Sequence, residues 1–261
     1  MHGPVMTIRF VTRKDLLARH DVLAAYMRSW QAAMYDPEPH LVAAGDSVWL
    51  GDDADEPVVL TAEQADAMNG ETIASFMALC DDFQGEPPRL DYAGRLVAET
   101  DASSFEDFTD RIGELFYAFA QKAGWSDILL ITEARRPLLA RELDHPPAVA
   151  TANALIELGF TRTFDGGIVC GPEDLSRLLP HFFRIARADG SAPAMLMTAQ
   201  GSRAVATPCK YGNLHFEIYD PVERDAIAEA LGKSGFLLAP DGECVERFSR
   251  DGAIEGRSFR I

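Results

Sequence analysis

The sequence lacks long apolar runs and locally paired cysteines. No window approaches the roughly 18 uninterrupted apolar residues of a membrane span, and the opening MHGPVMTIRF lacks the apolar core of a signal peptide. We therefore expect a soluble, unexported, cytoplasmic protein with no membrane partner. The four cysteines are scattered without a C-x-x-C pair, which argues against a zinc knuckle, a redox dithiol or a disulfide scaffold; they are Cys80, Cys170, Cys209 and Cys244.

Basic residues are also scarce, with 24 Lys and Arg against 41 Asp and Glu, a formal net charge of −17. This balance disfavours nucleic acid as a partner, because sequence-independent binding depends on basic side chains that neutralise phosphates. Two interpretations of the acidity stay open: a nucleic-acid mimic or binder of basic proteins, and a solubilising surface. We favour the second, because the basic residues are interspersed with the acids.

Several catalytic motifs are missing. The chain has no GxxxxGK[ST] or GxGxxG phosphate loop, no HExxH and no GxSxG. These absences disfavour P-loop hydrolases, Rossmann oxidoreductases, zincins and α/β-hydrolases. Cys170 and Cys209 are candidate nucleophiles, but neither has a neighbouring base in the sequence. We interpret both as buried structural thiols.

What is present is a repeated order of strand, helix, glycine-aromatic pair and strand. Helices ending at Gly124, Gly159 and Gly235 are each followed by Trp or Phe, and glycine adopts the left-handed conformation that ends a helix. Helix starts are predicted from Ser103-x-x-Glu106 and Thr61-x-x-Gln64 as capping boxes and from Asp220-Pro221.

Two further signals complete the prediction of the fold. Asp-Gly pairs at 165–166, 241–242 and 251–252 predict hairpins, and Pro180 predicts a kink or break in the helix that begins after Gly171. The expected class is α+β: a mixed, partly antiparallel sheet with packed helices. We place a boundary that divides an N-terminal lobe, residues 1–165, from a smaller antiparallel lobe, residues 166–261.

One strand carries candidate chemistry. The segment 209–220 reads CKYGNLHFEIYD. In it Leu214, Phe216 and Ile218 alternate with His215 and Glu217, so the imidazole and the carboxylate share one face of a strand. That spacing suits a shared proton or metal, but no third ligand lies nearby, so no metal is predicted. The alternative is a face in contact with water.

A second cluster, Glu133 to His145, follows the strand DILLIT and contains the adjacent Arg135 and Arg136. Two arginines at a strand end can hold a carboxylate or phosphate. Alternating charges in the cluster favour instead a solvated loop paired with itself.

Several segments in order resemble the GNAT acyltransferase superfamily: TIRFVTRKDL at the start, LVAET, the helix 104–123, DILLIT, and ANALIELGFTRT at 152–163. The resemblance covers residues 6–170. It implies a GNAT-like N-terminal lobe that binds acyl-coenzyme A at the start of helix 104–123, beside Ser103 and Ser104, with Glu99 as the base that deprotonates an attacking amine. The family's glycine-containing pyrophosphate turn is replaced here by ASSFEDFTD.

Two functions are therefore predicted. The first is a divergent or degenerate GNAT-like N-acyltransferase that uses acyl-coenzyme A. The second is a noncatalytic binding or regulatory protein of α+β fold with an acidic surface, whose partner, a small molecule or a protein, the sequence does not identify.

Overall fold

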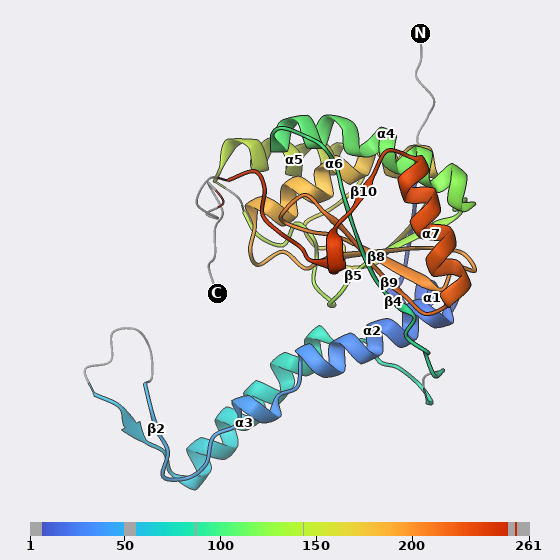
Figure 1. The fold of residues 1–261 in the computed structure, drawn as a ribbon. Helices are drawn as coiled ribbons and strands as arrows, with labels where there is room; N and C mark the ends of the chain where they lie inside the picture. The colour runs from blue at the N-terminus through green and yellow to red at the C-terminus, as the bar shows by residue number, and fades with distance from the viewer. Residues whose placement is uncertain (1–6, 50–55, 87, 143, 250–253, 255–261) are drawn as a thin grey trace.

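The computed structural model describes residues 7–49, 56–86, 88–142, 144–249 and 254 (Figure 1). These residues form an α+β fold, which confirms the predicted class. The helices are α1 (Arg13–Leu17), α2 (Asp21–Met34), α3 (Ala62–Leu79), α4 (Phe105–Ala123), α5 (Pro146–Glu157), α6 (Pro172–Ala188) and α7 (Pro221–Lys233), with 3-10 turns at Glu38–His40 and Pro240–Gly242. None of the helices in this part of the chain is long and apolar enough to cross a membrane.

The main sheet has eight strands in the order β1-β6-β5-β7-β8-β9-β4-β10, and all of their pairings are antiparallel. They are β1 (Arg9–Val11), β4 (Gly94–Glu99), β5 (Ile128–Thr132), β6 (Gly167–Cys170), β7 (Met195–Ala199), β8 (Ala204–Pro208), β9 (Leu214–Ile218) and β10 (Leu237–Leu238). Strands from both predicted lobes, 1–165 and 166–261, share this sheet.

Alternation along the strands builds two cores. On one face Leu130 and Phe216 pack with apolar side chains of α4, α5, α6 and α7, and Figure 1 shows these helices on that side. On the other face Leu129 and Val205 pack with side chains of α1 and α2. Because successive side chains in a strand point to opposite faces, the fully buried strand ILLIT of β5 supplies both cores.

The signals for helix ends are largely confirmed. Gly124, Gly159 and Gly235 have φ of 73°, 98° and 94°, the left-handed region that favours glycine. Thr61 and Gln64 form the predicted capping box. The predicted box at Ser103 is wrong by one residue, because Ser104 caps α4 by accepting a hydrogen bond from the Asp107 amide.

Other local predictions are wrong. Helix α6 continues through Pro180 from Pro172 to Ala188, so the predicted alternative of a break in this helix is wrong. The residues before Asp165-Gly166 form a turn instead of a strand, so this pair closes no hairpin; β6 pairs with β1 and β5. Asp241 and Gly242 have positive φ in a 3-10 turn, again without a hairpin. Asp251-Gly252 lies outside the described residues.

An arm projects from the sheet. We define the arm as residues 29–88, described here over 29–49, 56–86 and 88. Figure 1 shows α2 leaving the sheet, α3 running back beside it, and the strands β2 (Ser47–Val48) and β3 (Val58–Val59) at the far end. The Asn69 side chain accepts from the Val42 amide and donates to the Val42 carbonyl, and His40 stacks on Phe76. Such contacts hold the outgoing and returning segments together.

Helix α2 begins at a buried histidine that makes two hydrogen bonds. His20 is 3% exposed, its Nδ1 accepts from the Leu23 amide at 3.0 Å, and its Nε2 lies 3.0 Å from the Ala199 carbonyl, to which it donates. Burial lowers the pKa of His20 from its ordinary value of 6.5. The neutral ring therefore caps α2 and joins it to β7.

We predict a pH-dependent contribution to stability from His20. A pKa that is lower in the folded than in the unfolded chain stabilises the fold above the unfolded value, and the contribution is lost as pH falls below about 6.5. The loss has a limiting slope of about 1.4 kcal/mol per pH unit. In His20→Asn, which keeps a capping oxygen but does not titrate, unfolding in urea is expected to show a smaller loss of stability between pH 7.5 and 5 than the parent shows. The same pH dependence in both proteins would contradict this assignment.

Candidate functional site

The polar face of β9 is a connected patch. Over β9 the predicted alternation is confirmed, because Leu214, Phe216 and Ile218 are buried while His215 and Glu217 are half-buried on the opposite face. It does not extend to Asn213, which the same alternation places beside His215 but which is fully buried. The neighbouring strand β4 places Arg95 between these two side chains. Its Nε lies 3.4 Å from Glu217 Oε1, and its Nη2 lies 2.6 Å from His215 Nδ1.

Aromatic residues border this patch. The Tyr92 hydroxyl donates to Glu217 Oε2 at 2.9 Å. The rings of Tyr92 and Tyr26 both lie edge-on to Tyr219, at centroid distances of 5.9 and 6.4 Å. Burial is the main cause that raises the pKa of Tyr92 and of Tyr219 to about 12. These phenols therefore stay protonated at neutral pH, and Tyr92 acts as a hydrogen-bond donor.

Glu99, the base implied by the GNAT resemblance, lies on β4 beyond this patch. Its Oε2 is 3.7 Å from Nη1 of Arg247, and only 16% of its side chain is exposed. The same Arg247 nitrogen donates to the Thr100 carbonyl at 2.6 Å. Glu99 thus helps to anchor the C-terminal segment against the sheet.

Ser103 and Ser104 lie at the start of α4, where the implied cofactor would bind. The Ser103 amide and hydroxyl donate to Asp107 Oδ2 at 2.9 and 3.2 Å, and the Asp107 amide donates to the Ser104 hydroxyl at 3.1 Å. The hydrogen bond from the Ser103 amide is the main cause that lowers the pKa of Asp107. An incoming phosphate would therefore meet a carboxylate at this helix end, and coenzyme A binding stays a prediction.

The exposed Arg135 and Arg136 follow β5 near the root of the arm. The Arg135 amide donates to the carbonyl of Leu79, the last residue of α3, at 2.9 Å. The backbone of this loop thus joins the arm to the sheet.

Two cysteines that are 35 positions apart meet next to His215. The sulfurs of Cys209 and Cys244 lie 3.4 Å apart, and these sulfurs and a ring nitrogen of His215 all lie within 4.8 Å of one another. Cys209 follows β8, and Cys244 belongs to the irregular segment that follows β10. The prediction from spacing missed this pair because it tested only near neighbours in sequence.

Hydrogen bonds converge on both sulfurs. Asn213, which is fully buried, directs Nδ2 to Cys244 Sγ at 3.3 Å, and the Tyr211 amide donates to Cys209 Sγ at 3.5 Å. The hydrogen bond from Cys209 is the main cause that lowers the pKa of Cys244, with further contributions from His215 and Asn213. The same hydrogen bond raises the pKa of Cys209. The directions of these two shifts favour Cys244 over Cys209 as the thiolate of the pair.

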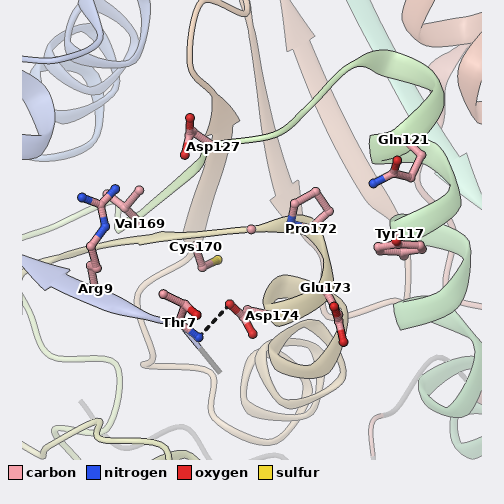
Figure 2. A pocket seen from close by; sticks show the side chains of 11 residues that line it. Thr7, Arg9, Tyr117, Gln121, Asp127, Val169, Cys170, Pro172, Glu173 and Asp174 are labelled. Carbon is pink, nitrogen blue, oxygen red and sulfur yellow. Dashed lines mark hydrogen bonds between the residues drawn. The ribbon is translucent and has the colours of Figure 1, made fainter. Parts of the chain in front are cut away.

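A separate pocket lies between β1, β6 and the start of α6, with a volume of about 470 Å³. Figure 2 shows Arg9 at one side of the lining, the carboxylates of Asp127, Glu173 and Asp174, and the bond from the Thr7 amide to Asp174. The lining includes Asp127, Glu173 and Asp174, which disfavours an anionic ligand. Burial raises the pKa of the Cys170 thiol in this pocket to about 12, so Cys170 is not a nucleophile at neutral pH, in line with its prediction as a structural thiol.

The surface of the arm is strongly acidic. Between Arg28 and Arg89 lie 13 of the 41 Asp and Glu residues and none of the 24 Lys and Arg residues. This stretch therefore carries −13 of the net charge of −17, and the expectation that bases are interspersed with acids is wrong here. The acids in the described part of the arm with exposed side chains are Asp36, Glu38, Asp46, Glu56, Glu63, Asp66, Glu71, Asp82 and Glu86.

Large apolar side chains accompany these acids. Trp49 and Val59 at the far end are each 63% exposed, and Met77 on α3 is 67% exposed. Only Ala65 of the 18 residues of α3 is buried. Most helical stability in proteins comes from burying an apolar face. Helix α3 buries almost none of its side chains and therefore gains little stability from packing within this chain.

Comparison with protein-family models, with curated proteins and with solved structures finds no match to this chain. The functional argument therefore depends on the residues and geometry described above.

Proposed function

We propose that this protein is a noncatalytic binding protein whose arm docks onto a basic surface of a partner protein. The observation that carries this proposal is the stretch between Arg28 and Arg89, which has 13 acids and no lysine or arginine and projects away from the sheet (Figure 1). Exposed charges of one sign raise the association rate with an oppositely charged partner and select against partners of like charge.

The mixture of acids and large apolar side chains supports a protein as the partner. Protein interfaces have apolar and aromatic centres with polar rims, and Trp49, Val59 and Met77 provide exposed apolar area next to the acids. Nucleic acid is disfavoured because phosphates would be repelled along the whole arm. A basic protein with apolar side chains among its lysines and arginines would match both properties.

The root of the arm is rigid enough to present this surface. Arg13, 7% exposed, forms two hydrogen-bonded contacts with Asp81, at 2.8 Å each. Gln31 Nε2 donates to Asp81 Oδ2 at 3.0 Å, and the Asp81 amide donates to Gln31 Oε1 at 2.8 Å. Both ends of the arm therefore meet at Asp81, which the buried Arg13 holds against the sheet. A preorganised surface loses less conformational entropy when it binds.

Charge reversal on the arm tests the proposal. In Glu56→Lys/Asp66→Lys/Glu71→Lys, three exposed acids become bases. Each exposed ion pair contributes about 0.2–1 kcal/mol, so we expect affinity for the partner to fall by about 3-fold to 150-fold. Partners would be identified by cross-linking and mass spectrometry in extracts of the source cell. Dissociation constants would then be measured with the purified partner at two salt concentrations.

The matched control reverses three acids on the body of the protein. Asp110→Lys/Glu114→Lys/Glu157→Lys makes the same change in charge on α4 and α5, where these side chains are exposed. This control should bind as the parent does. Equal loss in both variants, or no loss in either, would contradict docking through the arm. Saturable binding of acetyl-coenzyme A with turnover of an amine would instead favour the acyltransferase hypothesis.

A further inference from the structure

His215 lies beside the Cys209–Cys244 pair, and its contact with Arg95 determines which ring nitrogen carries the proton. Arg95 Nη2 lies 2.6 Å from His215 Nδ1, and a guanidinium group only donates hydrogen bonds. His215 Nδ1 must therefore accept, which places the proton of the neutral ring on Nε2. Nε2 is buried and has no hydrogen-bond partner among the described residues, so its proton is free to interact with the sulfurs, which lie within 4.8 Å of the ring.

Two polar groups lie within hydrogen-bond distance of the Cys244 sulfur, the Cys209 sulfur at 3.4 Å and the Asn213 amide at 3.3 Å, and a ring nitrogen of His215 lies within 4.8 Å of it. The amide of Asn213 is fully buried and its Oδ1 has no hydrogen-bond partner in the described structure. Burial of a polar atom without a partner is costly. The orientation of the amide is explained by the two acceptors of its Nδ2, the Cys244 sulfur at 3.3 Å and the Val245 carbonyl at 3.4 Å.

From this geometry we propose that Cys209 and Cys244 form a redox-active thiol pair, in which Cys244 attacks a peroxide and Cys209 closes an intramolecular disulfide. This inference concerns a site apart from the arm and does not depend on the proposed docking function. Both cysteines are half-buried and therefore accessible to a small oxidant.

The reaction balances with hydrogen peroxide as the oxidant. The Cys244 thiolate attacks one peroxide oxygen, an S–O bond forms, the O–O bond breaks, and hydroxide leaves. Cys209 then attacks the Cys244 sulfur, the S–O bond breaks, and water leaves with the thiol proton. The two thiols lose two electrons in total, and the peroxide gains them.

The chain is arranged to allow this closure. Cys209 lies in a turn closed by Gly212, whose φ is 77°, and Cys244 lies in a segment without regular secondary structure beyond the turn at Pro240–Gly242. The sulfurs must approach from 3.4 Å to about 2.05 Å. The Arg187–Glu246 ion pair, at 3.0 Å, keeps the segment near β9 while this small shift occurs.

A metal centre is the competing use of the same three side chains, since zinc accepts two thiolates and an imidazole. Binding through His215 Nε2 would move the ring proton to Nδ1, where it would face the Arg95 guanidinium. The observed contact between Arg95 and His215 therefore favours the redox pair.

Mass spectrometry of the thiols tests the proposal. The reduced protein would be treated with one equivalent of hydrogen peroxide, alkylated and digested. We expect a cross-linked Cys209–Cys244 peptide, while Cys80 and Cys170 stay free. Before oxidation, Cys244 should react with iodoacetamide at pH 6 at least about tenfold faster than Cys80 or Cys170, because only thiolates react.

Variants separate the two roles. Cys209→Ser should leave a sulfenic acid at Cys244 that dimedone traps, whereas Cys244→Ser should leave Cys209 reduced. His215→Ala should slow alkylation of Cys244 without changing the circular dichroism spectrum. Equal reactivity of all four thiols, or no cross-link, would overturn the proposal. So would tight binding of one Co²⁺ with a thiolate-to-metal absorption band that both cysteine variants abolish, since that result defines a metal centre.

Discussion

Replacing Arg13 with methionine is expected to lower the free energy of unfolding by about 3–5 kcal/mol, the usual effect of removing one partner of a buried ion pair. The guanidinium uses every donor it has. Besides its two bonds to Asp81, it donates to the Thr132 hydroxyl and carbonyl at 2.9 and 2.8 Å and to the Asp165 carbonyl at 3.2 Å. Methionine leaves the Asp81 carboxylate in a buried site without its cation. Equilibrium unfolding in urea, followed by circular dichroism, measures the loss.

A double variant shows whether the uncompensated charge is the cause. Arg13→Met/Asp81→Leu removes both charges, and we expect it to recover part of the stability that Arg13→Met loses, because two apolar side chains need no counter-ion. Arg13→Lys keeps the charge but cannot reproduce the paired hydrogen bonds of the planar guanidinium. Its free energy of unfolding should lie between those of the parent and of Arg13→Met. A loss below about 1 kcal/mol in Arg13→Met, the range of an exposed pair, would contradict the structural role.

The same variant connects stability to the proposed function. Asp81 lies just after α3, and Gln31, which also bonds Asp81, lies near the end of α2. Loss of Arg13 therefore loosens both ends of the arm, while the acids of the arm stay in place. Affinity for a basic partner should fall less than in the charge-reversed variant, because the charge that attracts the partner is unchanged.

Local structure was predictable from the sequence because its causes are local. Glycine at 124, 159 and 235 ends a helix through its own backbone conformation, and the alternation in β9 follows from the pleat of a strand. The break between α1 and α2 at His20 has no comparable local signal. Histidine is an uncommon cap, and its bond to Ala199 joins residues that are distant in sequence.

Sites that depend on strand order could not be predicted. The proximity of Cys209 and Cys244 requires that β9 lie beside β4 and that the chain after β10 cross back over them. The GNAT resemblance followed the order of elements along the chain, yet the strands LVAET and DILLIT, which lie in β4 and β5, are separated in the sheet by β7, β8 and β9. Of the features used in the functional argument, the absence of Lys and Arg between Arg28 and Arg89 was visible in the sequence. Counting charged residues over the whole chain obscured it.

Gly113→Ala is expected to destabilise the protein by about 1–3 kcal/mol, the usual cost of overpacking a core. Helices α4 and α6 approach closely at Gly113, where an added Cβ would lie 2.2 Å from the Ser176 carbonyl oxygen and 3.1 Å from its carbon. Backbone atoms of a helix cannot rotate away as a side chain can, so the two helices must separate. Urea unfolding of the variant measures the loss.

Gly232→Ala in α7 is the matched control. An added Cβ there meets no atom within 4 Å, so alanine should stabilise the helix by about 0.5–1 kcal/mol through the lower entropy of the unfolded chain. The two substitutions add the same atom to a helix and are expected to have opposite signs. If Gly113→Ala were also stabilising, the close approach of α4 to α6 would be wrong. The position of Arg187, which α6 carries to Glu246 beside the thiol pair, would then be uncertain as well, because the packing of α4 against α6 positions that helix.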